Sequence, residues 1–248
     1  KAKDLVAIVA QGTTTVASDV IHHQSGENYM QTLDRTTVAA DKVLIQGHDV
    51  HLKAIDTHST QRTDIIATGG SVVDEAVPLV SYRVDRYHSR DESTTVRTTH
   101  VHQTTSSHRS DGIAAIVAPV GILQQGTHLA NARLEAPVVI QDAVHDQHIV
   151  DIETIRHKKA GGIFGSWFGI TERKTTHSGS AASIARGGIN AGREFIANAT
   201  TRFRAVAPTF TAERSDITAP QIEITTGVSQ SQSFTQSTYQ GPVWNKSS

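Results

Sequence analysis

The chain has 248 residues and a formal net charge of −1, with 23 lysines and arginines against 24 aspartates and glutamates. This balance argues against a partner recognised by bulk charge, so we expect no nucleic-acid partner. The sequence contains no cysteine, which excludes disulfides, thiolate metal sites and cysteine nucleophiles. Aromatic residues make up only 5% of the chain, and no apolar run reaches the length of a membrane-spanning helix.

Short segments in which aliphatic or β-branched residues alternate with polar residues recur along the chain. They include residues 43–45, 50–54, 149–152 and 221–224. Period-two alternation in runs this short predicts strands with one buried face. Amphipathic helices are hard to find, because the best candidate, residues 183–199, contains three glycines, each of which weakens a helix by about 1 kcal/mol.

The sequence also resembles itself. Residues 40–62, ADKVLIQGHDVHLKAIDTHSTQR, align with residues 136–158, APVVIQDAVHDQHIVDIETIRHK, and a shorter copy lies at 218–227. Four of the six prolines follow an alanine and precede an apolar or alternating run, which indicates a recurring corner at the start of a strand. Repetition, short strands and regular corners predict a solenoid with about 20 residues per turn. We therefore predict an all-β protein, a right-handed parallel β-helix over residues 1–226 whose thin core needs only small and β-branched side chains.

Two polar stretches interrupt this pattern, at residues 82–110 and near 156–177. We interpret them as strand excursions that stand out from the rod. The Ser/Gln/Thr-rich residues 227–248 form a separate polar C-terminal segment, either a strand pair or a tail. Between the polar strands of the second excursion, the glycine-rich residues 161–169 are expected to form a loop. Its aromatic residues either pack over the flank or end of the rod, or form an exposed patch that contacts a partner.

Fourteen histidines raise the question of a metal site. His100 and His102 share one face of a strand, which is a spacing that can chelate a metal. No acidic residue stands at a convincing third-ligand spacing, and most histidines lie in polar, turn-rich segments. We therefore predict solvated surface histidines, with no metal and no cofactor, and a pH-sensitive surface as the alternative.

Paired carboxylates raise the question of catalysis. The pairs are Asp74 with Glu75, Asp91 with Glu92, and Asp142 with Asp146, and Arg90 adds a cation near the second pair. Enzymes of the β-helix class that cut polysaccharides gather such groups in one groove. Alternating ion pairs on a solvated surface explain the same residues more simply. We expect no catalytic residue, with a polysaccharide-acting enzyme as the rival.

Residues 43–60, VLIQGHDVHLKAIDTHST, resemble the haemagglutinin repeats of filamentous haemagglutinin-like exoproteins. In that family a Gly-x-Asp/Asn turn precedes an alternating Val-x-Leu-x-Ala strand. The matching residues are Gly47, Asp49, Val50, Leu52 and Ala54. Residues 153–177, in which polar strands flank the GGIFG of 161–165, and residues 183–200 also resemble parts of such repeats.

The resemblance implies a β-helical shaft of a secreted protein on the bacterial cell surface, as in two-partner-secreted adhesins and contact-dependent inhibition proteins. Its role would be structural and adhesive, and it would display or deliver a distal module. The implied partners are a receptor on a host or neighbouring cell, an outer-membrane transporter during secretion, and the remainder of a larger polypeptide. The start at Lys1 agrees with the expectation of a fragment or processed product.

The contact residues are expected in the excursions, because exposed aromatic residues and arginines dominate contact energetics. The candidates are Tyr82, Arg83, Arg86, Tyr87 and Trp167. Two other interpretations stay open. One is a carbohydrate-binding or polysaccharide-acting β-helix protein, and the other is a structural subunit in which residues 227–248 dock on a partner.

Overall fold

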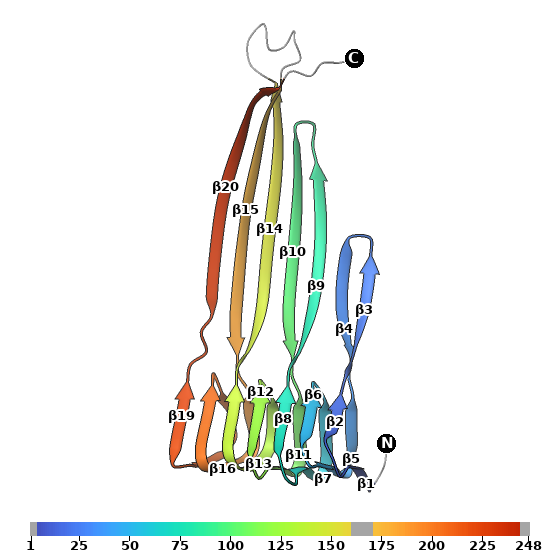
Figure 1. The fold of residues 1–248 in the computed structure, drawn as a ribbon, viewed down its shortest axis with the longest axis vertical. Helices are drawn as coiled ribbons and strands as arrows, with labels where there is room; N and C mark the ends of the chain where they lie inside the picture. The colour runs from blue at the N-terminus through green and yellow to red at the C-terminus, as the bar shows by residue number, and fades with distance from the viewer. Residues whose placement is uncertain (1–3, 160–170, 244–248) are drawn as a thin grey trace.

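The computed structural model describes residues 4–159 and 171–243, and within these ranges the protein is all-β. It contains a 13-stranded sheet whose strands pair in parallel and a 7-stranded sheet whose strands pair antiparallel. The described ranges hold no helix that could cross a membrane. The predicted all-β class is confirmed, and Figure 1 shows the parallel strands as a stack from which the antiparallel sheet projects.

The parallel sheet is built from repeated units that we call rungs, which have three consecutive strand segments each, except that the first described rung has two, β1 (Leu5–Val9) and β2 (Thr14–Ala17). The other strands of this sheet are β5 (Thr37–Gly47), β6 (Val50–Lys53), β7 (Asp56–Ala67), β8 (Ser71–Glu75), β11 (Ser107–Val117), β12 (Gly121–Gln125), β13 (His128–Asp142), β16 (Ile189–Val206), β17 (Thr209–Phe210), β18 (Arg214–Thr218) and β19 (Gln221–Thr225). Val43 pairs with Thr63, and Phe195 with Ser215, 20 residues further along in both cases. Proline marks one corner, since Pro119, Pro137 and Pro220 all stand just before the third segment of a rung.

The interior of the stack consists of columns of register partners. One column is Ile45, Ile65, Ile116 and Leu134, and another is Val50, Val72, Ile122 and Val139. All of these side chains are buried. Burial of aliphatic columns is the largest favourable contribution to a stack of this kind.

The prediction that small aliphatic side chains suffice for the core is wrong in two respects. Phe195 and Phe203 are fully buried, and the Phe195 ring lies 5.6 Å from that of Phe210 between centroids. The interior also holds buried polar residues, among them Asp74 and His108. Asp74 and His108 lie at the corner between the third segment of one rung and the first segment of the next, and a second buried set of Ser59, Thr63 and Ser110 lies between first and second segments.

This polar corner lies where the chain leaves the stack to form hairpins. Asp74 accepts hydrogen bonds from the hydroxyls of Ser106 and Thr127, the latter at 2.8 Å. His108 bridges the same carboxylate and a hydroxyl, with Nε2 at 3.0 Å from Asp74 Oδ2 and Nδ1 at 3.0 Å from the Thr57 Oγ1. The network satisfies polar groups that would otherwise be costly to bury.

The antiparallel sheet is made of hairpins that leave the stack at this one corner after every second rung. Its strands are β3 (Asp19–Ser25), β4 (Asn28–Asp34), β9 (Val77–His88), β10 (Glu92–Thr104), β14 (Val144–Lys159), β15 (Thr171–Arg186) and β20 (Gln230–Val243). The hairpin strands lengthen along the chain, from 7 residues in β3 to 16 in β14, and Figure 1 shows them side by side on one side of the stack.

The observed excursions differ in extent from the predicted ones. The predicted range 82–110 corresponds to a hairpin over residues 77–104, after which β11 returns to the stack. The range near 156–177 falls within a longer hairpin formed by β14 and β15, and the hairpin of β3 and β4 was not anticipated. In the segment 227–248, β20 pairs with β15 along the sheet. The predicted loop 161–169 with Trp167 lies outside the described residues.

Gly112 allows a close approach of two rungs at a corner of the stack. A Cβ atom at this position would lie 1.9 Å from the Gln61 carbonyl oxygen, so the backbone would have to shift. We expect Gly112→Ala to lower the free energy of unfolding by about 1–3 kcal/mol, as overpacking does. Gly12→Ala is the matched control, because no atom lies within 4 Å of its added Cβ. Chemical denaturation followed by circular dichroism measures both, and equal midpoints for the two variants would contradict the packing argument.

Asp74→Ala tests the polar corner. The substitution leaves the buried groups of Ser106, His108 and Thr127 without their shared acceptor. We expect a loss of about 3–5 kcal/mol in the free energy of unfolding, the usual cost of breaking a buried polar pair. Asp216→Ala, which removes only the exposed ion pair to Arg214, should cost less than about 1 kcal/mol. If both variants denature at the same denaturant concentration, the buried network does not contribute to the stability of the fold.

Candidate functional site

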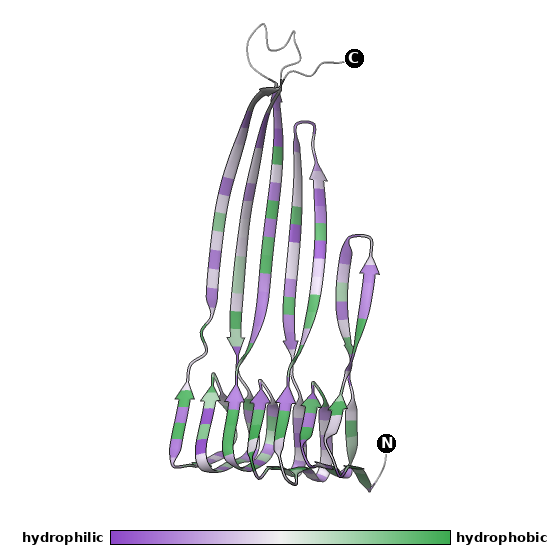
Figure 2. Ribbon diagram, viewed as in Figure 1, coloured by the Kyte–Doolittle hydropathy of each residue, from purple (hydrophilic) through white to green (hydrophobic). Residues whose placement is uncertain are grey.

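The projecting antiparallel sheet is a single layer, and its residues alternate between two faces. Alternate positions of a strand point to opposite faces, so β9 places Tyr82 and Arg86 on one face and Arg83 and Tyr87 on the other. We call these the Tyr82 face and the Tyr87 face. Figure 2 shows short hydrophobic and hydrophilic bands alternating along the projecting strands. The structure therefore divides the four described candidates equally between two surfaces.

Both candidate arginines are already paired. Arg83 Nε donates to Asp85 Oδ1 at 2.9 Å, and Arg86 donates to Glu27 Oε1 of the first hairpin at 2.7 Å. The hydrogen bond to Asp85 raises the pKa of Arg83 above its ordinary value, and the bond to Glu27 does the same for the pKa of Arg86. A partner would therefore have to compete with these carboxylates. The aromatic side chains are the freer contact groups, since Tyr87 is 61% exposed.

A cavity opens where the first two hairpins part. The strands β4 and β9 pair only at Tyr29 with Tyr82 and at Met30 with Ser81. Beyond these pairs the side chains of Asn28 and Gln31 accept hydrogen bonds from β9 main-chain amides, at 2.9 and 2.7 Å. The resulting space, which we call the hairpin cavity, has a volume of about 550 Å³. Its lining includes Tyr29, Met30, Tyr82, Arg83, Asp85 and His100.

The Tyr87 face carries rows of hydroxyl and imidazole groups across neighbouring strands. Thr94 lies opposite Tyr87 and Thr154, and Thr176 lies opposite Thr154 and Ser237. A second row contains His100 and His148, whose rings stack with centroids 4.2 Å apart. Such rows offer regularly spaced polar groups at the strand separation of about 4.8 Å.

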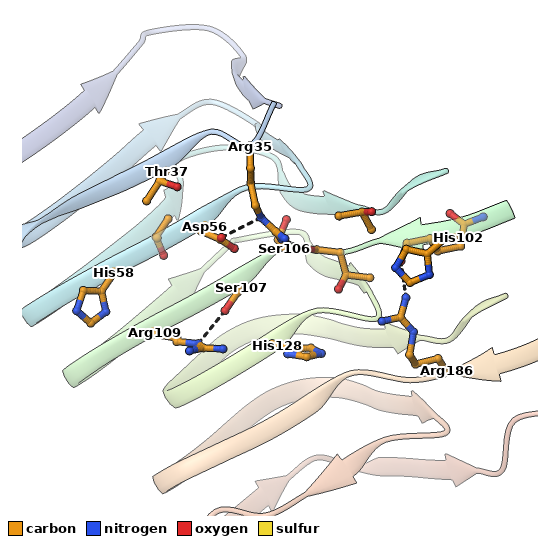
Figure 3. Close-up of a pocket in the computed structure, with 14 residues that line it drawn as sticks. Arg35, Thr37, Asp56, His58, His102, Ser106, Ser107, Arg109, His128 and Arg186 are labelled. Atoms are coloured by element: carbon orange, nitrogen blue, oxygen red, sulfur yellow. Dashed lines mark hydrogen bonds and ion pairs between the residues drawn. The ribbon is translucent and has the colours of Figure 1, made fainter. Parts of the chain in front are cut away.

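A second cavity, the basic cleft, lies between the base of the antiparallel sheet and the outer face of the stack. It has a volume of about 440 Å³. Arg35, Arg109 and Arg186 enter it from three sides, as Figure 3 shows, with His128 between Arg109 and Arg186. His58, His102 and the carboxylate of Asp56 complete its charged and titratable lining.

Two of these arginines are fixed by contacts to main-chain carbonyls, one in the link between β10 and β11 and one near the end of β10. Arg35 Nε lies 2.8 Å from Asp56 Oδ2, and another nitrogen of Arg35 donates to the Thr105 carbonyl. Arg186 donates to the Gln103 carbonyl, and its Nε lies 3.4 Å from Asp146 Oδ2.

Arg109 lacks an acidic partner. It makes one hydrogen bond, from Nε to Ser107 Oγ at 3.1 Å, and no carboxylate of the described chain forms an ion pair with it.

The pKa of His128 reports the balance of charge in the cleft. Burial lowers the pKa of His128 below its ordinary value, and the positive charges of Arg186, Arg109 and Arg35 lower it further. The carboxylate of Asp56 acts in the opposite direction. Positive potential therefore exceeds negative potential at the floor of the cleft.

The carboxylates proposed for a catalytic groove do not converge. Asp74 is buried inside the stack, Glu75 pairs with Lys53 at 3.3 Å, and Glu92 pairs with Arg156 at 2.6 Å. Asp142 lies 3.8 Å from Arg204, and Asp146 contacts Arg186 and His102. Within residues 4–159 and 171–243, no group of three or more histidine, aspartate or glutamate side chains is arranged to hold a metal ion.

Comparison with family models, with curated proteins and with solved structures finds no match to this chain. The interpretation of its function therefore depends on the geometry of its own residues.

His128 provides a test of the electrostatics of the basic cleft. Arg109→Gln removes one of the three positive charges that lower the pKa of His128, so we expect that pKa to rise toward its ordinary value. Because the pKa is lowered in the folded state, His128 contributes a loss of stability as the pH falls through the ordinary histidine range near about 6.5. Arg109→Gln should reduce that loss.

Titration of the His128 ring by NMR measures this shift directly. Arg62→Gln is the control, because Arg62 pairs with Asp64 on the same stack and does not line the cleft. An unchanged or lower pKa of His128 in Arg109→Gln would contradict the assignment of the cleft potential to Arg109.

Proposed function

We propose that this chain is a segment of a right-handed parallel β-helical shaft that displays a contact surface on a bacterial cell surface. The successive parallel pairings at 20-residue intervals support the β-helical part of the proposal. The resemblance of residues 43–60 to filamentous haemagglutinin repeats supports the part on secretion and adhesion. In this role the stack is structural, and the hairpins carry the recognition.

The two ends of the stack support a place within a longer rod. At one end Leu5 and Val9 of β1 are 54% and 58% exposed, and at the other end Ile222 and Ile224 of β19 are each 51% exposed. Both strands are edge strands within the described ranges, since each pairs on one side only. Apolar side chains on an open edge are suited to stacking on a further rung. We propose the remainder of a larger polypeptide as the source of such rungs.

The hairpin cavity is the observation that carries the adhesive part of the proposal. It brings Tyr82 and Arg83, two residues chosen from sequence, together with Tyr29 and Met30 of another hairpin. Aromatic rings beside polar groups in an open cavity are suited to binding a partner such as a surface saccharide. A receptor on a neighbouring or host cell is the proposed partner.

Adhesion of the labelled chain to cells tests this proposal. Tyr82→Ala, which opens the hairpin cavity, should reduce binding several-fold, because truncation of a central aromatic contact residue commonly costs more than about 1 kcal/mol. Tyr87→Ala tests a residue outside the cavity, on the same face as Arg83 and His100 of the lining, since Tyr87 does not line the cavity. Ile113→Ala is the control, because Ile113 is an exposed apolar residue of the parallel stack.

A glycan array with the same variants identifies the class of partner. Binding of saccharides that is lost in Tyr82→Ala favours a carbohydrate receptor, and cell binding without any saccharide binding favours a protein receptor. The proposal is wrong if the wild-type chain binds cells no better than serum albumin, or if Ile113→Ala reduces binding as much as Tyr82→Ala.

A further inference from the structure

The basic cleft combines a partly enclosed space with an excess of positive charge. Three guanidinium groups and three imidazoles line it, and Asp56 is the one carboxylate in the lining. Arg35 and Arg186 have carboxylate partners in Asp56 and Asp146, whereas Arg109 has none within the described residues and leaves the cleft with an excess positive charge. We propose that the cleft is a binding site for a tetrahedral oxyanion, a phosphate or sulfate group.

Arg109 is the group that would make the main contact. Its Nε is occupied by Ser107 Oγ, whereas its terminal nitrogens make no hydrogen bond to the described chain. A guanidinium offers two parallel N–H groups to an oxyanion, which gives shorter and stronger hydrogen bonds than neutral donors do. The bond to Ser107 holds the side chain over the cleft, so little conformational freedom is lost on binding.

Arg35 and Arg186 shape the site from the opposite side. Both side chains are anchored on main-chain carbonyls, those of Thr105 and Gln103, and therefore hold their positive charges at the cleft without rearrangement. Fixed charges in a partly enclosed cavity attract an anion more strongly than mobile ones in water. Arg35 and Arg186 therefore keep the electrostatic potential of the cleft positive, and Arg109 supplies N–H groups that have no other partner in the described chain.

His128 would report the bound anion. Its pKa is lowered partly by Arg186, Arg109 and Arg35, so a negative charge among these groups should raise it again. The coupling is reciprocal, and the anion should bind more tightly as His128, which shares the cleft with the imidazoles of His58 and His102, becomes protonated. Asp56, and Asp146 at the rim beside His102 and Arg186, oppose this effect at every pH at which they are ionised.

The site is separate from the proposed hairpin cavity, and its test does not involve adhesion. The full chain is titrated with sodium phosphate and sodium sulfate at an ionic strength kept constant with sodium chloride. Ring resonances of His128 are followed by NMR, and affinities are measured by calorimetry. We expect saturable shifts with one or both anions, which identifies the preferred oxyanion. Sulfate affinity should increase as the pH falls from about 7.5 to about 5, since sulfate keeps its charge while His128, whose pKa lies below the ordinary histidine value near about 6.5, takes up a proton.

Two variants make the result specific to the cleft. Arg109→Gln should weaken binding at least about tenfold, the loss expected for charge-assisted hydrogen bonds to an anion. Arg62→Gln replaces a surface arginine on the same stack, and this variant should bind the anion as the wild type does. The proposal is overturned if neither anion shifts His128 beyond the chloride control, or if Arg109→Gln binds with unchanged affinity.

Discussion

The spacing between hydrogen-bonded strands is the constraint on which the rest of the structure depends. Each rung adds one strand to each column of the parallel sheet, and each hairpin adds two strands to the antiparallel sheet. Strands lie about 4.8 Å apart in both kinds of sheet. Because a hairpin leaves the stack after every second rung, the two sheets advance by the same distance per repeat. A hairpin from every rung would crowd its neighbours, and one from every third rung would leave a strand-wide gap.

The corner at which the hairpins leave determines both polar regions of the molecule. Alternation along the first segments sends Thr57 and His108 into the interior, where they join Asp74, and sends Asp56 and Arg109 outward into the basic cleft. The buried network and the cleft are therefore the two sides of the same strands. Elsewhere the interior is mainly aliphatic, apart from the rings of Phe195 and Phe203 and a buried hydroxyl set of Ser59, Thr63 and Ser110.

The sequence could predict the local features of this fold. Alternation at residues 50–54 indicates a strand, and the Ala-Pro dipeptides indicate corners, because both signals depend on neighbouring residues alone. The interpretation of the histidines as solvated is wrong for His108, which is fully buried. Its partners Thr57 and Asp74 stand 51 and 34 residues away, so no local pattern could reveal them.

The sites depend on the same long-range placement. Tyr29 meets Tyr82 only because the first two hairpins leave the stack two rungs apart. The first hairpin also has a weak strand pattern of its own, since the apolar residues of β3, Val20 and Ile21, are adjacent to each other and are followed only by polar residues and histidines. The carboxylate pairs adjacent in sequence were a poor guide, because alternation along a strand sends Asp74 inward and Glu75 outward to Lys53.

The single-layered sheet places its most ordered functional surface at its base. Both faces of the projecting strands are open, so the sheet is held by main-chain pairing and cross-strand side-chain contacts without a core of its own. At the base, Arg35 at the end of the first hairpin binds the link that follows the second hairpin, and Arg186 at the end of the third binds the Gln103 carbonyl of β10 in the second. A ligand in the basic cleft would touch the roots of all three hairpins at once. Arg35 and Arg186 therefore link the arrangement of the projecting hairpins to the binding of a ligand in the basic cleft. The aromatic contact groups lie further out on the hairpins.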